Sequence, residues 1–459
     1  MSKSLSRRSF LKAAALGTAG AALAACQAAG QTEQPTQAAG QGQSEATSAP
    51  SSNNAPAKEK QKVTFTMYGH PGLIEEMVPI FNQSQPDVEV EFERSEGQGY
   101  NEKLTAAVAA GSMWDSFRTD LSQALNWGVK GALLDVRKFL DADKQYPGSD
   151  YIPGVLDVFT VEGKTYGVPT WATTMWLFYN QKMFDEAGIS YPTTTTTWPE
   201  YIEMAKKLTK RDGDRITQFG MASWDSWTFP VAQVVWSNGG KFYYNDDLTK
   251  VAVDDPKTVE ALQLLADMIH VEKVAPNPNV PASSPVGLLN DNVATVGDGD
   301  WLPWDNNEVF SQKADYLDAT LCPTFDGQRQ NIYYGEGLVV SAKSQVAEGA
   351  YKWCAWFAQD PEATAIQCKV VFPTYTKAYT DPAISSRWLV APRPKGMIDA
   401  AKEHVEQAKL WRVEAHGAEL DTIYYNEIGR LWSNEAKAAE VAKKITEDGN
   451  AALAKPVGG

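Results

Sequence analysis

The chain after residue 60 alternates between two kinds of hydrophobic pattern. Residues 63–67 alternate apolar and polar side chains, which is typical of a half-buried strand. Residues 73–81 place large apolar side chains at helical spacing, and residues 88–92 alternate again. This order predicts a strand–helix–strand unit whose two strands are parallel.

Helix boundary signals continue this alternation along the chain. A helix over 100–110 is expected to end at Gly111, because glycine adopts the left-handed conformation that follows many helices. Thr197-Trp198-Pro199-Glu200 has the composition of a capping box with proline in the first turn. Asp360-Pro361-Glu362 predicts a similar helix start. The sequence therefore predicts an α/β body without a fixed-period repeat.

The first 25 residues have the pattern of a secretory leader. Arg7-Arg8-Ser9-Phe10-Leu11-Lys12 is a twin-arginine pattern, and a stretch of small, weakly apolar residues follows it up to Ala25. That stretch is shorter than the roughly 20 residues that span a bilayer. We therefore predict a signal peptide of the twin-arginine type over residues 1–25, with general secretory export as the alternative.

Leu23-Ala24-Ala25-Cys26 resembles the bacterial lipobox, in which the cysteine is lipidated and becomes the new N-terminus. Residues 27–60 contain no Val, Ile, Leu, Met, Phe, Trp or Tyr, so they cannot form a core. Residues 26–61 are predicted to be the lipidated Cys26 and a disordered tether, with a reach of roughly 30 Å. The expected location is outside the cytoplasm, anchored to the cell membrane as a lipoprotein.

Composition changes this picture in two respects. The chain has 57 acidic and 42 basic side chains, a formal net charge of −15, which disfavours nucleic-acid binding. It also has 15 Trp, 18 Tyr and 16 Phe residues. A core does not require so many amphipathic rings, so some of them are expected to line a surface or cleft.

Several motifs, in order along the chain, resemble those of extracellular solute-binding proteins of family 1, the sugar-binding lipoproteins of ABC importers, similar to maltose-binding protein. The motifs are Tyr100–Leu104, Gly163–Pro169, Leu177–Asn180, Phe184–Gly188, Thr197–Glu200, Gly297–Trp301 and Gly335–Ser341. The resemblance covers nearly all of the predicted folded part.

The resemblance implies a clamp of two α/β lobes, discontinuous in sequence and joined by a hinge. Residues 62–170 with 335–370 would form the N-terminal lobe, and residues 171–334 with 371–455 the C-terminal lobe. It also implies a monomer that binds a carbohydrate between the lobes and delivers it to the permease subunits of an ABC transporter. No cofactor and no metal is implied.

Clusters that combine aromatic rings with carboxylates or arginine are the candidate ligand-binding sites. Apolar sugar faces pack on flat rings, and sugar hydroxyls donate to carboxylates. The alternative for each tryptophan is packing beneath a loop or in the hinge. The candidates are Trp114, Asp115, Asp120, Trp171, Trp224, Asp225, Trp227, Trp236, Asp298, Asp300, Trp301, Tyr334, Glu336, Arg387 and Trp388.

The sequence offers little sign of catalysis. The four histidines are scattered without metal-ligand spacing, and neither a Gly-x-Ser-x-Gly elbow nor a phosphate loop is present. The chain is therefore expected not to be an enzyme. A receptor for a polyol phosphate or another polar solute is an alternative, as is an exported enzyme acting on polysaccharide, since a pair of facing carboxylates leaves no sequence signature.

Three cysteines remain beside Cys26. Because Cys322, Cys354 and Cys368 are odd in number, at least one of them is free or pairs elsewhere. A bridge between Cys354 and Cys368 is the hypothesis that the sequence suggests.

Overall fold

The computed structural model describes residues 59–95, 99–222, 224, 227–246, 248–279, 287–305, 307–391, 393–411 and 416–455. The predicted leader, Cys26 and the tether up to residue 58 lie outside them. Within the described residues, no helix combines the length and apolar character needed to cross a membrane.

The first elements form the predicted parallel unit. They are β1 (Gln61–Met67), α2 (Pro71–Ser84), β2 (Val88–Arg94), α3 (Tyr100–Ala110) and β3 (Ser116–Thr119). β1 pairs in parallel with both β2 and β3. Gly111 ends α3 in the left-handed conformation, and its N–H bonds to the carbonyls of Ala107 and Val108. The sequence signals for this unit are confirmed.

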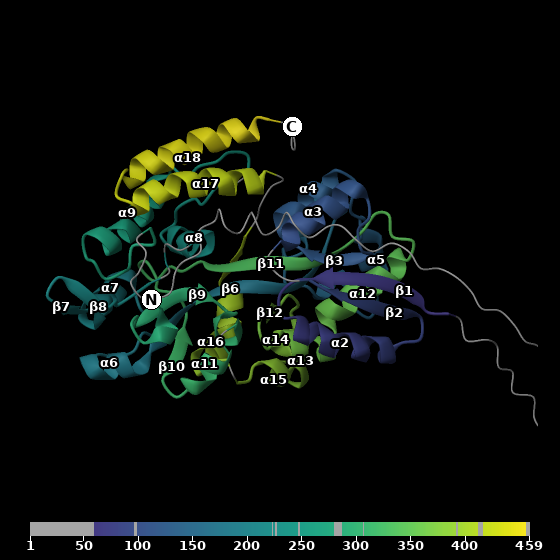
Figure 1. Ribbon diagram of the computed structural model, residues 1–459, viewed down its shortest axis with the longest axis horizontal. Coiled ribbons are helices and arrows are strands. Elements are labelled where there is room, and N and C mark those ends of the chain that lie inside the picture. The colour runs from purple at the N-terminus through teal and green to yellow at the C-terminus, as the bar shows by residue number, and fades with distance from the viewer. Residues whose placement is uncertain are drawn as a thin grey trace, which may run out of the picture. The chain divides into compact units, whose positions relative to one another are not determined.

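One mixed sheet joins the strands of the described chain in the order β10-β6-β11-β3-β1-β2. Its long strand β6 (Val168–Asn180) is buried along its entire length. The first half of β6 pairs antiparallel with β11 (Asn331–Val340), and the second half pairs with β9 (Thr295–Gly299) and β10 (Leu317–Thr320). Figure 1 shows β6 and β11 passing between β1–β3 on one side and β9–β10 on the other. These two strands therefore connect both ends of the sheet.

Two of the three predicted lobe boundaries fall within these connecting strands, and the third, at 370/371, lies between α13 (Pro361–Gln367) and β12 (Phe372–Pro373). The boundary at 170/171 lies in β6, and the boundary at 334/335 lies in β11. The division of the chain into the two residue sets given above remains a prediction.

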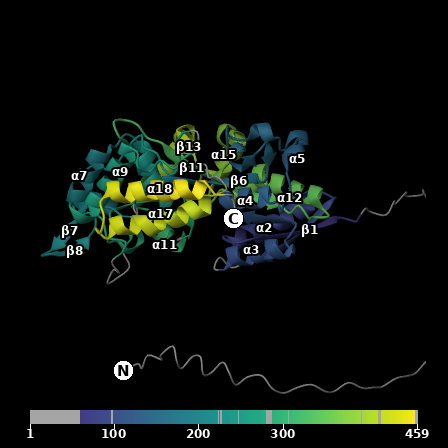
Figure 2. The ribbon, with the colours of Figure 1, turned by 90° about the horizontal axis from the view of Figure 1, so that it is seen from above.

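The other elements cover the two faces of the sheet or form small satellites. The short strands β12 (Phe372–Pro373) and β13 (Ala408–Leu410) add to the main sheet, on β6 and β11. Two separate two-stranded sheets consist of β4 (Thr160–Val161) with β5 (Lys164–Thr165) and of β7 (Lys210–Asp212) with β8 (Arg215–Gln218). The helices are α4 (Leu121–Val129), α5 (Arg137–Ala142), α6 (Gln181–Ala187), α7 (Trp198–Leu208), α8 (Thr228–Ser237), α9 (Pro256–His270), α10 (Leu302–Asp305), α11 (Asn307–Gln312), α12 (Ala347–Gln359), α13 (Pro361–Gln367), α14 (Lys377–Thr380), α15 (Pro382–Trp388), α16 (Lys395–Glu406), α17 (Gly417–Trp432) and α18 (Ala438–Leu453). Figures 1 and 2 both show α17 and α18 side by side.

Capping residues begin two of these helices as predicted. The Thr197 side chain and the Glu200 side chain form a reciprocal capping box at α7. The Asp360 carboxylate accepts from the Glu362 N–H at the start of α13. Both interactions satisfy backbone donors that the first turn of a helix leaves unpaired.

Two apolar clusters lie on opposite faces of the sheet. Ile332 belongs to one cluster, and the next residue along β11, Tyr333, belongs to the other. Side chains alternate between faces along a strand, so this assignment follows from the pleat. A register shift between Glu336 and Gly337 interrupts the alternation. Such bulges re-aim side chains, and this one lies beside the candidate site described below.

The predicted bridge between Cys354 and Cys368 is not formed. Cys322, Cys354 and Cys368 are all free and buried. The Cys354 sulfur on α12 lies 3.1 Å from the Ser116 hydroxyl on β3, so it faces the sheet. Burial raises the pKa of the Cys354 thiol to about 12, which keeps it protonated and unreactive.

Candidate ligand-binding site

An ion pair between β3 and β11 forms the centre of the candidate site. The Arg118 Nε donates to Glu336 Oε2 at 2.8 Å, and the Arg118 Nη2 donates to the same oxygen. The Trp171 Nε1 on β6 also donates to Glu336 Oε2, at 2.7 Å. The Arg118 and Glu336 side chains keep only 10% and 15% of their surface exposed. Three neighbouring strands thus bring a cation, a carboxylate and an indole to one place.

Aromatic rings flank the Arg118 guanidinium. Its central carbon lies 4.2 Å from the centroid of the Tyr68 ring and 5.5 Å from that of the Trp171 ring. Tyr68 follows β1 directly and is half-buried, and its ring packs against Tyr100 at 4.9 Å. The cation–π contacts hold the guanidinium in a fixed orientation.

Asp120 and Tyr334 extend the site from the ion pair. The Asp120 carboxylate caps α4 by accepting from the Gln123 N–H at 2.9 Å and from the Ser122 hydroxyl at 2.9 Å. The Tyr334 hydroxyl accepts from the Leu121 N–H at 3.2 Å. Burial raises the pKa of both side chains, against the hydrogen bonds that Asp120 accepts. Helix α4 therefore fixes both polar groups beside the ion pair.

A row of aromatic rings continues from Tyr334. The Tyr334 ring centroid lies 4.9 Å from that of Phe229, which lies 4.6 Å from that of Trp227. The Trp227 centroid lies 5.5 Å from that of Trp301, with the rings edge to face. Tyr334, Trp227 and Trp301 are each half-buried rather than fully enclosed. We refer to Tyr334, Phe229, Trp227 and Trp301 as the aromatic row.

A glycine makes room for the last ring of this row. A Cβ atom at Gly299 would lie 1.9 Å from the Trp301 ring, a distance that no side chain tolerates. Asp300, between the two, is almost fully buried and is paired through its backbone with Thr174 on β6. Its Oδ1 accepts from the Thr174 N–H at 3.1 Å, and its Oδ2 is buried without a hydrogen-bond partner. Trp301 is therefore held by a turn that is bonded directly to β6.

Comparison with known proteins decides the family. A sequence profile described as bacterial extracellular solute-binding protein matches residues 76–392. The chain belongs to this family. Members are extracellular binding proteins rather than enzymes, which agrees with the expected extracytoplasmic location.

Curated relatives of this solute-binding protein bind different solutes. An arabinooligosaccharide-binding protein from Halalkalibacterium halodurans is 27% identical, over 50% of this chain and 52% of the relative. A mannitol-binding protein from Pseudomonas aeruginosa is 23% identical, over 60% of this chain and 64% of the relative. An sn-glycerol-3-phosphate-binding periplasmic protein from Rhizobium meliloti is 24% identical, over 83% of this chain and 90% of the relative. The chain thus spans only about half to two thirds of the first two relatives.

Solved structures share the fold. A substrate-binding protein of an ABC transporter from Listeria monocytogenes, in complex with cycloalternan, has a TM-score of 0.74 at 24% identity over 87% of this chain and 100% of that chain. The GacH receptor of Streptomyces glaucescens, studied with acarbose, has a TM-score of 0.71 at 20% identity over 86% of this chain and 99% of that chain. The predicted fold class, a two-lobe clamp of the periplasmic-binding-protein type, is confirmed.

Seven of the sequence-predicted site residues of this solute-binding protein lie together at the ion pair and the aromatic row. They are Asp120, Trp171, Trp227, Asp300, Trp301, Tyr334 and Glu336. Arg118, Tyr68 and Phe229 lie there as well and were not predicted from the sequence.

Two predicted tryptophans lie in the interior instead. Trp224 is 2% exposed, and its Nε1 donates to the Tyr201 hydroxyl at 3.0 Å. A Cβ atom at Gly297 would lie 2.6 Å from the Trp224 ring. Trp236 is buried with its ring centroid 5.4 Å from that of Trp411. These contacts favour the packing alternative for both rings.

Trp114 and Asp115 lie at the amino end of β3, whereas Asp120 follows its carboxyl end. The Trp114 Nε1 donates to Glu93 Oε2 at 2.8 Å. The Asp115 carboxylate accepts from the Thr64 N–H and from the hydroxyls of Thr64 and Ser344. These bonds tie the start of β3 to its neighbours, so the two residues are separated from the ion pair.

Arg387 and Trp388 make their hydrogen bonds away from the ion pair, whereas Asp298 lies on β9, directly before the turn that carries Trp301. Arg387 forms two hydrogen bonds with the exposed Glu362, at 2.9 and 2.7 Å. Trp388 is fully buried and donates to the Ala378 carbonyl at 3.0 Å. The Asp298 carboxylate on β9 accepts from the Gly299 N–H at 2.7 Å. Asp225 lies outside the described residues.

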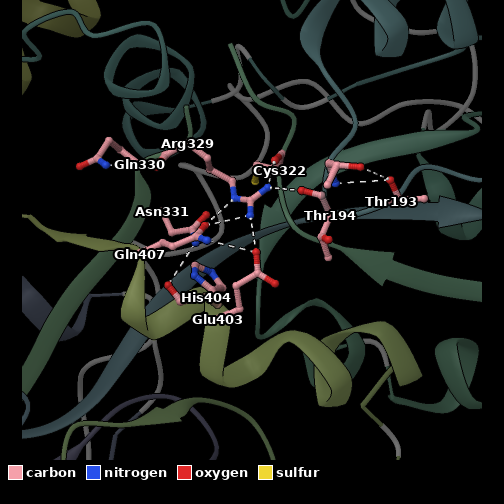
Figure 3. Close-up of polar contacts among 10 residues, drawn as sticks. Thr193, Thr194, Cys322, Arg329, Gln330, Asn331, Glu403, His404 and Gln407 are labelled. Carbon is pink, nitrogen blue, oxygen red and sulfur yellow. Dashed lines mark hydrogen bonds and ion pairs between the residues drawn. The ribbon is translucent and has the colours of Figure 1, made fainter. Parts of the chain in front are cut away.

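A second buried arginine has a structural role. The Arg329 Nη1 donates to the Thr194 carbonyl at 2.6 Å, and its Nη2 donates to Glu403 Oε1 at 2.9 Å. Its Nε donates to Gln407 Oε1 at 3.2 Å (Figure 3). The guanidinium thereby fastens the end of α16 to the segment before α7. Its donors are directed at protein acceptors rather than at a ligand.

A separate groove lies on the other face of β11. It encloses about 610 Å³, and Tyr333 lines it together with residues of α14, α16 and β13 such as Tyr379, Val405 and Leu410. Tyr333 points away from the face that carries Tyr334. The groove is therefore distinct from the aromatic row. Elsewhere among the described residues, no group of three His, Cys, Asp or Glu side chains is arranged to hold a metal ion.

Proposed function

We propose that this chain is the receptor of an ABC importer and binds a carbohydrate at the ion pair and the aromatic row. The observation that carries the proposal is the junction of the buried Arg118–Glu336 pair with a row of half-buried rings. The Glu336 carboxylate can accept from sugar hydroxyls, and exposed ring faces can pack against sugar C–H groups. Relatives that bind arabinooligosaccharide and mannitol support this choice of ligand.

We also propose where the chain is located and how it delivers its ligand. The chain acts as a monomer, is exported by its leader and is held at the cell membrane by a lipid on Cys26. It closes around the saccharide and presents the closed form to a permease, because a ligand shifts a hinged protein toward the state that it binds better. No covalent step is involved.

A receptor for a phosphorylated polyol is the second candidate. The sn-glycerol-3-phosphate-binding relative aligns over 83% of this chain, which favours it. A phosphate ligand is best bound by unpaired Arg or Lys donors. At the described site, Arg118 already donates through two nitrogens to Glu336. Carbohydrate is therefore the preferred ligand class.

A thermal-shift screen of the purified chain tests the proposed function. We expect at least one neutral saccharide among arabinotriose, maltotriose and mannitol to raise the melting temperature in a saturable way. A ligand at 100 times its Kd stabilises a folded protein by about 2.7 kcal/mol. Chromatography of the recovered saccharide provides the control for turnover. No shift with any saccharide, or cleavage of the one that binds, would contradict the proposal.

A further inference from the structure

The charges at the candidate site affect which ligands it can bind. The Arg118 guanidinium is buried, and its Nε and Nη2 both donate to Glu336 Oε2. Glu336 also accepts from the Trp171 Nε1 at 2.7 Å, so its position is fixed from two strands. The positive charge of Arg118 is therefore compensated before any ligand arrives.

A second carboxylate lies beside this pair. Asp120 caps α4 and lies near enough to Arg118 and Glu336 for both charges to act on it. Arg118 is the cation whose charge acts on Asp120 and Tyr334, against the two carboxylates Glu336 and Asp120. Asp300 is a third carboxylate within reach of the Glu336 charge, and the Arg393 cation lies near it. Charged groups act strongly on one another where little water is present. An anionic ligand would therefore meet net repulsion, whereas an uncharged hydroxyl can donate to either carboxylate.

We propose that Glu336 and Asp120 are specificity-determining residues that restrict the site to uncharged saccharides, Glu336 by neutralising Arg118. This inference rests on the proposed function and adds the charge class of the ligand. Acidic and phosphorylated counterparts of a bound saccharide are rejected by charge rather than by shape. Removing the Glu336 charge should therefore admit them.

Glu336→Gln is the direct test. The amide keeps the size of the side chain and an oxygen that can accept from Trp171 and Arg118. Neutral probes are compared with acidic counterparts by calorimetry: mannitol with mannitol 1-phosphate, and arabinotriose and maltotriose with the aldonic acids made by oxidising their reducing ends. The measured quantity is the Kd of the acidic probe divided by the Kd of its neutral partner. We expect this ratio to fall at least tenfold in Glu336→Gln.

Glu93→Gln is the matched control. Glu93 also accepts from an indole, Trp114, and pairs with a cation, Lys103 at 2.8 Å. It lies on β2, three strands from β11 in the sheet, or about 14 Å across the strands. The ratio should remain at its wild-type value in Glu93→Gln. An equal fall in both variants would overturn the proposal, because a general loss of acidic charge would then explain the effect.

Two further variants keep the test decisive. The double variant Arg118→Gln/Glu336→Gln should lose the gain in acidic-probe binding, because that gain requires the uncompensated guanidinium. If Glu336→Gln does not fold, Asp120→Asn removes the neighbouring charge, and asparagine caps a helix as well as aspartate does. The ratio should then fall at least threefold, and an unchanged ratio would overturn the proposal.

The outcomes also separate this inference from the proposed function. Failure of the wild-type chain to bind any neutral probe would remove the proposed function and this inference with it. Wild-type binding of a neutral probe, with an unchanged ratio in Glu336→Gln, would overturn the inference alone. So would a wild-type chain that binds acidic and neutral partners equally.

Discussion

Replacing Trp301 by alanine should weaken saccharide binding at least tenfold and leave the melting temperature of the unliganded protein nearly unchanged. Trp301 is half-buried at the end of the aromatic row, and Gly299 leaves the space that its ring occupies. Loss of a stacking ring from a binding site typically costs about 2 kcal/mol or more of binding free energy. Calorimetric titration gives the affinity, and thermal unfolding without ligand gives the stability.

Trp224→Ala provides the matched comparison. Trp224 is 2% exposed and donates to Tyr201, so its loss should cost about 3–5 kcal/mol of unfolding free energy. Molecules of this variant that remain folded should keep their affinity. If Trp301→Ala instead lowers the melting temperature strongly and keeps its affinity, Trp301 is a packing residue and its assignment to the site is wrong.

Asp300→Asn should stabilise the protein above pH 7 and have little effect near pH 4. Burial raises the pKa of the Asp300 carboxyl to about 7, although the nearby charge of Arg393 and the hydrogen bond from Thr174 act in the opposite direction. An unfolded aspartate titrates near 3.9, so the folded protein binds the extra proton between about pH 4 and pH 7. The contribution of Asp300 to wild-type stability therefore falls as pH rises through this window, by about 4 kcal/mol in all.

Asparagine removes this titration, because its amide is neutral at every pH while its oxygen can still accept from Thr174. The difference in unfolding free energy between variant and wild type should therefore grow from pH 4 to pH 7 and remain constant above pH 8. Asp141→Asn, at an exposed position on α5, is the control and should show no such change. A variant less stable than wild type at pH 8 would mean that attraction to Arg393 exceeds the cost of burying the carboxylate.

Local signals in the sequence predicted the elements of the fold well. The alternating and helical spacings between residues 63 and 92 became β1, α2 and β2, and the capping box at Thr197 became the start of α7. These features depend on residues a few positions apart. The two-lobe arrangement depended on the family resemblance, because no local pattern encodes how β6 and β11 cross between sheet halves.

The site was predicted only in part, because pairing between distant residues decides which side chains meet. Arg118 lies in a short strand and meets Glu336, 218 positions later in the chain. In the sequence, Arg118 is marked only as a charged residue directly after Phe117, which is buried in the same strand. Trp224 and Trp227 are three residues apart and alike in sequence context. One packs in the core and the other in the aromatic row.

The disulfide hypothesis was wrong for a related reason. The odd number of cysteines does not indicate where each sulfur points, and neither does the short distance in sequence between Cys354 and Cys368. Cys354 faces Ser116 on β3, and Cys368 follows α13 with its sulfur buried. Side-chain direction around α12 therefore decided the outcome.

A crystal structure with a bound neutral saccharide tests the central claim most directly. The saccharide should be the one that gives the largest thermal shift in the screen of mannitol, arabinotriose and maltotriose. The account predicts electron density for it against Trp301 and Tyr334, with a hydroxyl within hydrogen-bond distance of the Glu336 carboxylate. Density in the groove lined by Tyr333 and Tyr379, on the opposite face of β11, with the aromatic row empty, would contradict it.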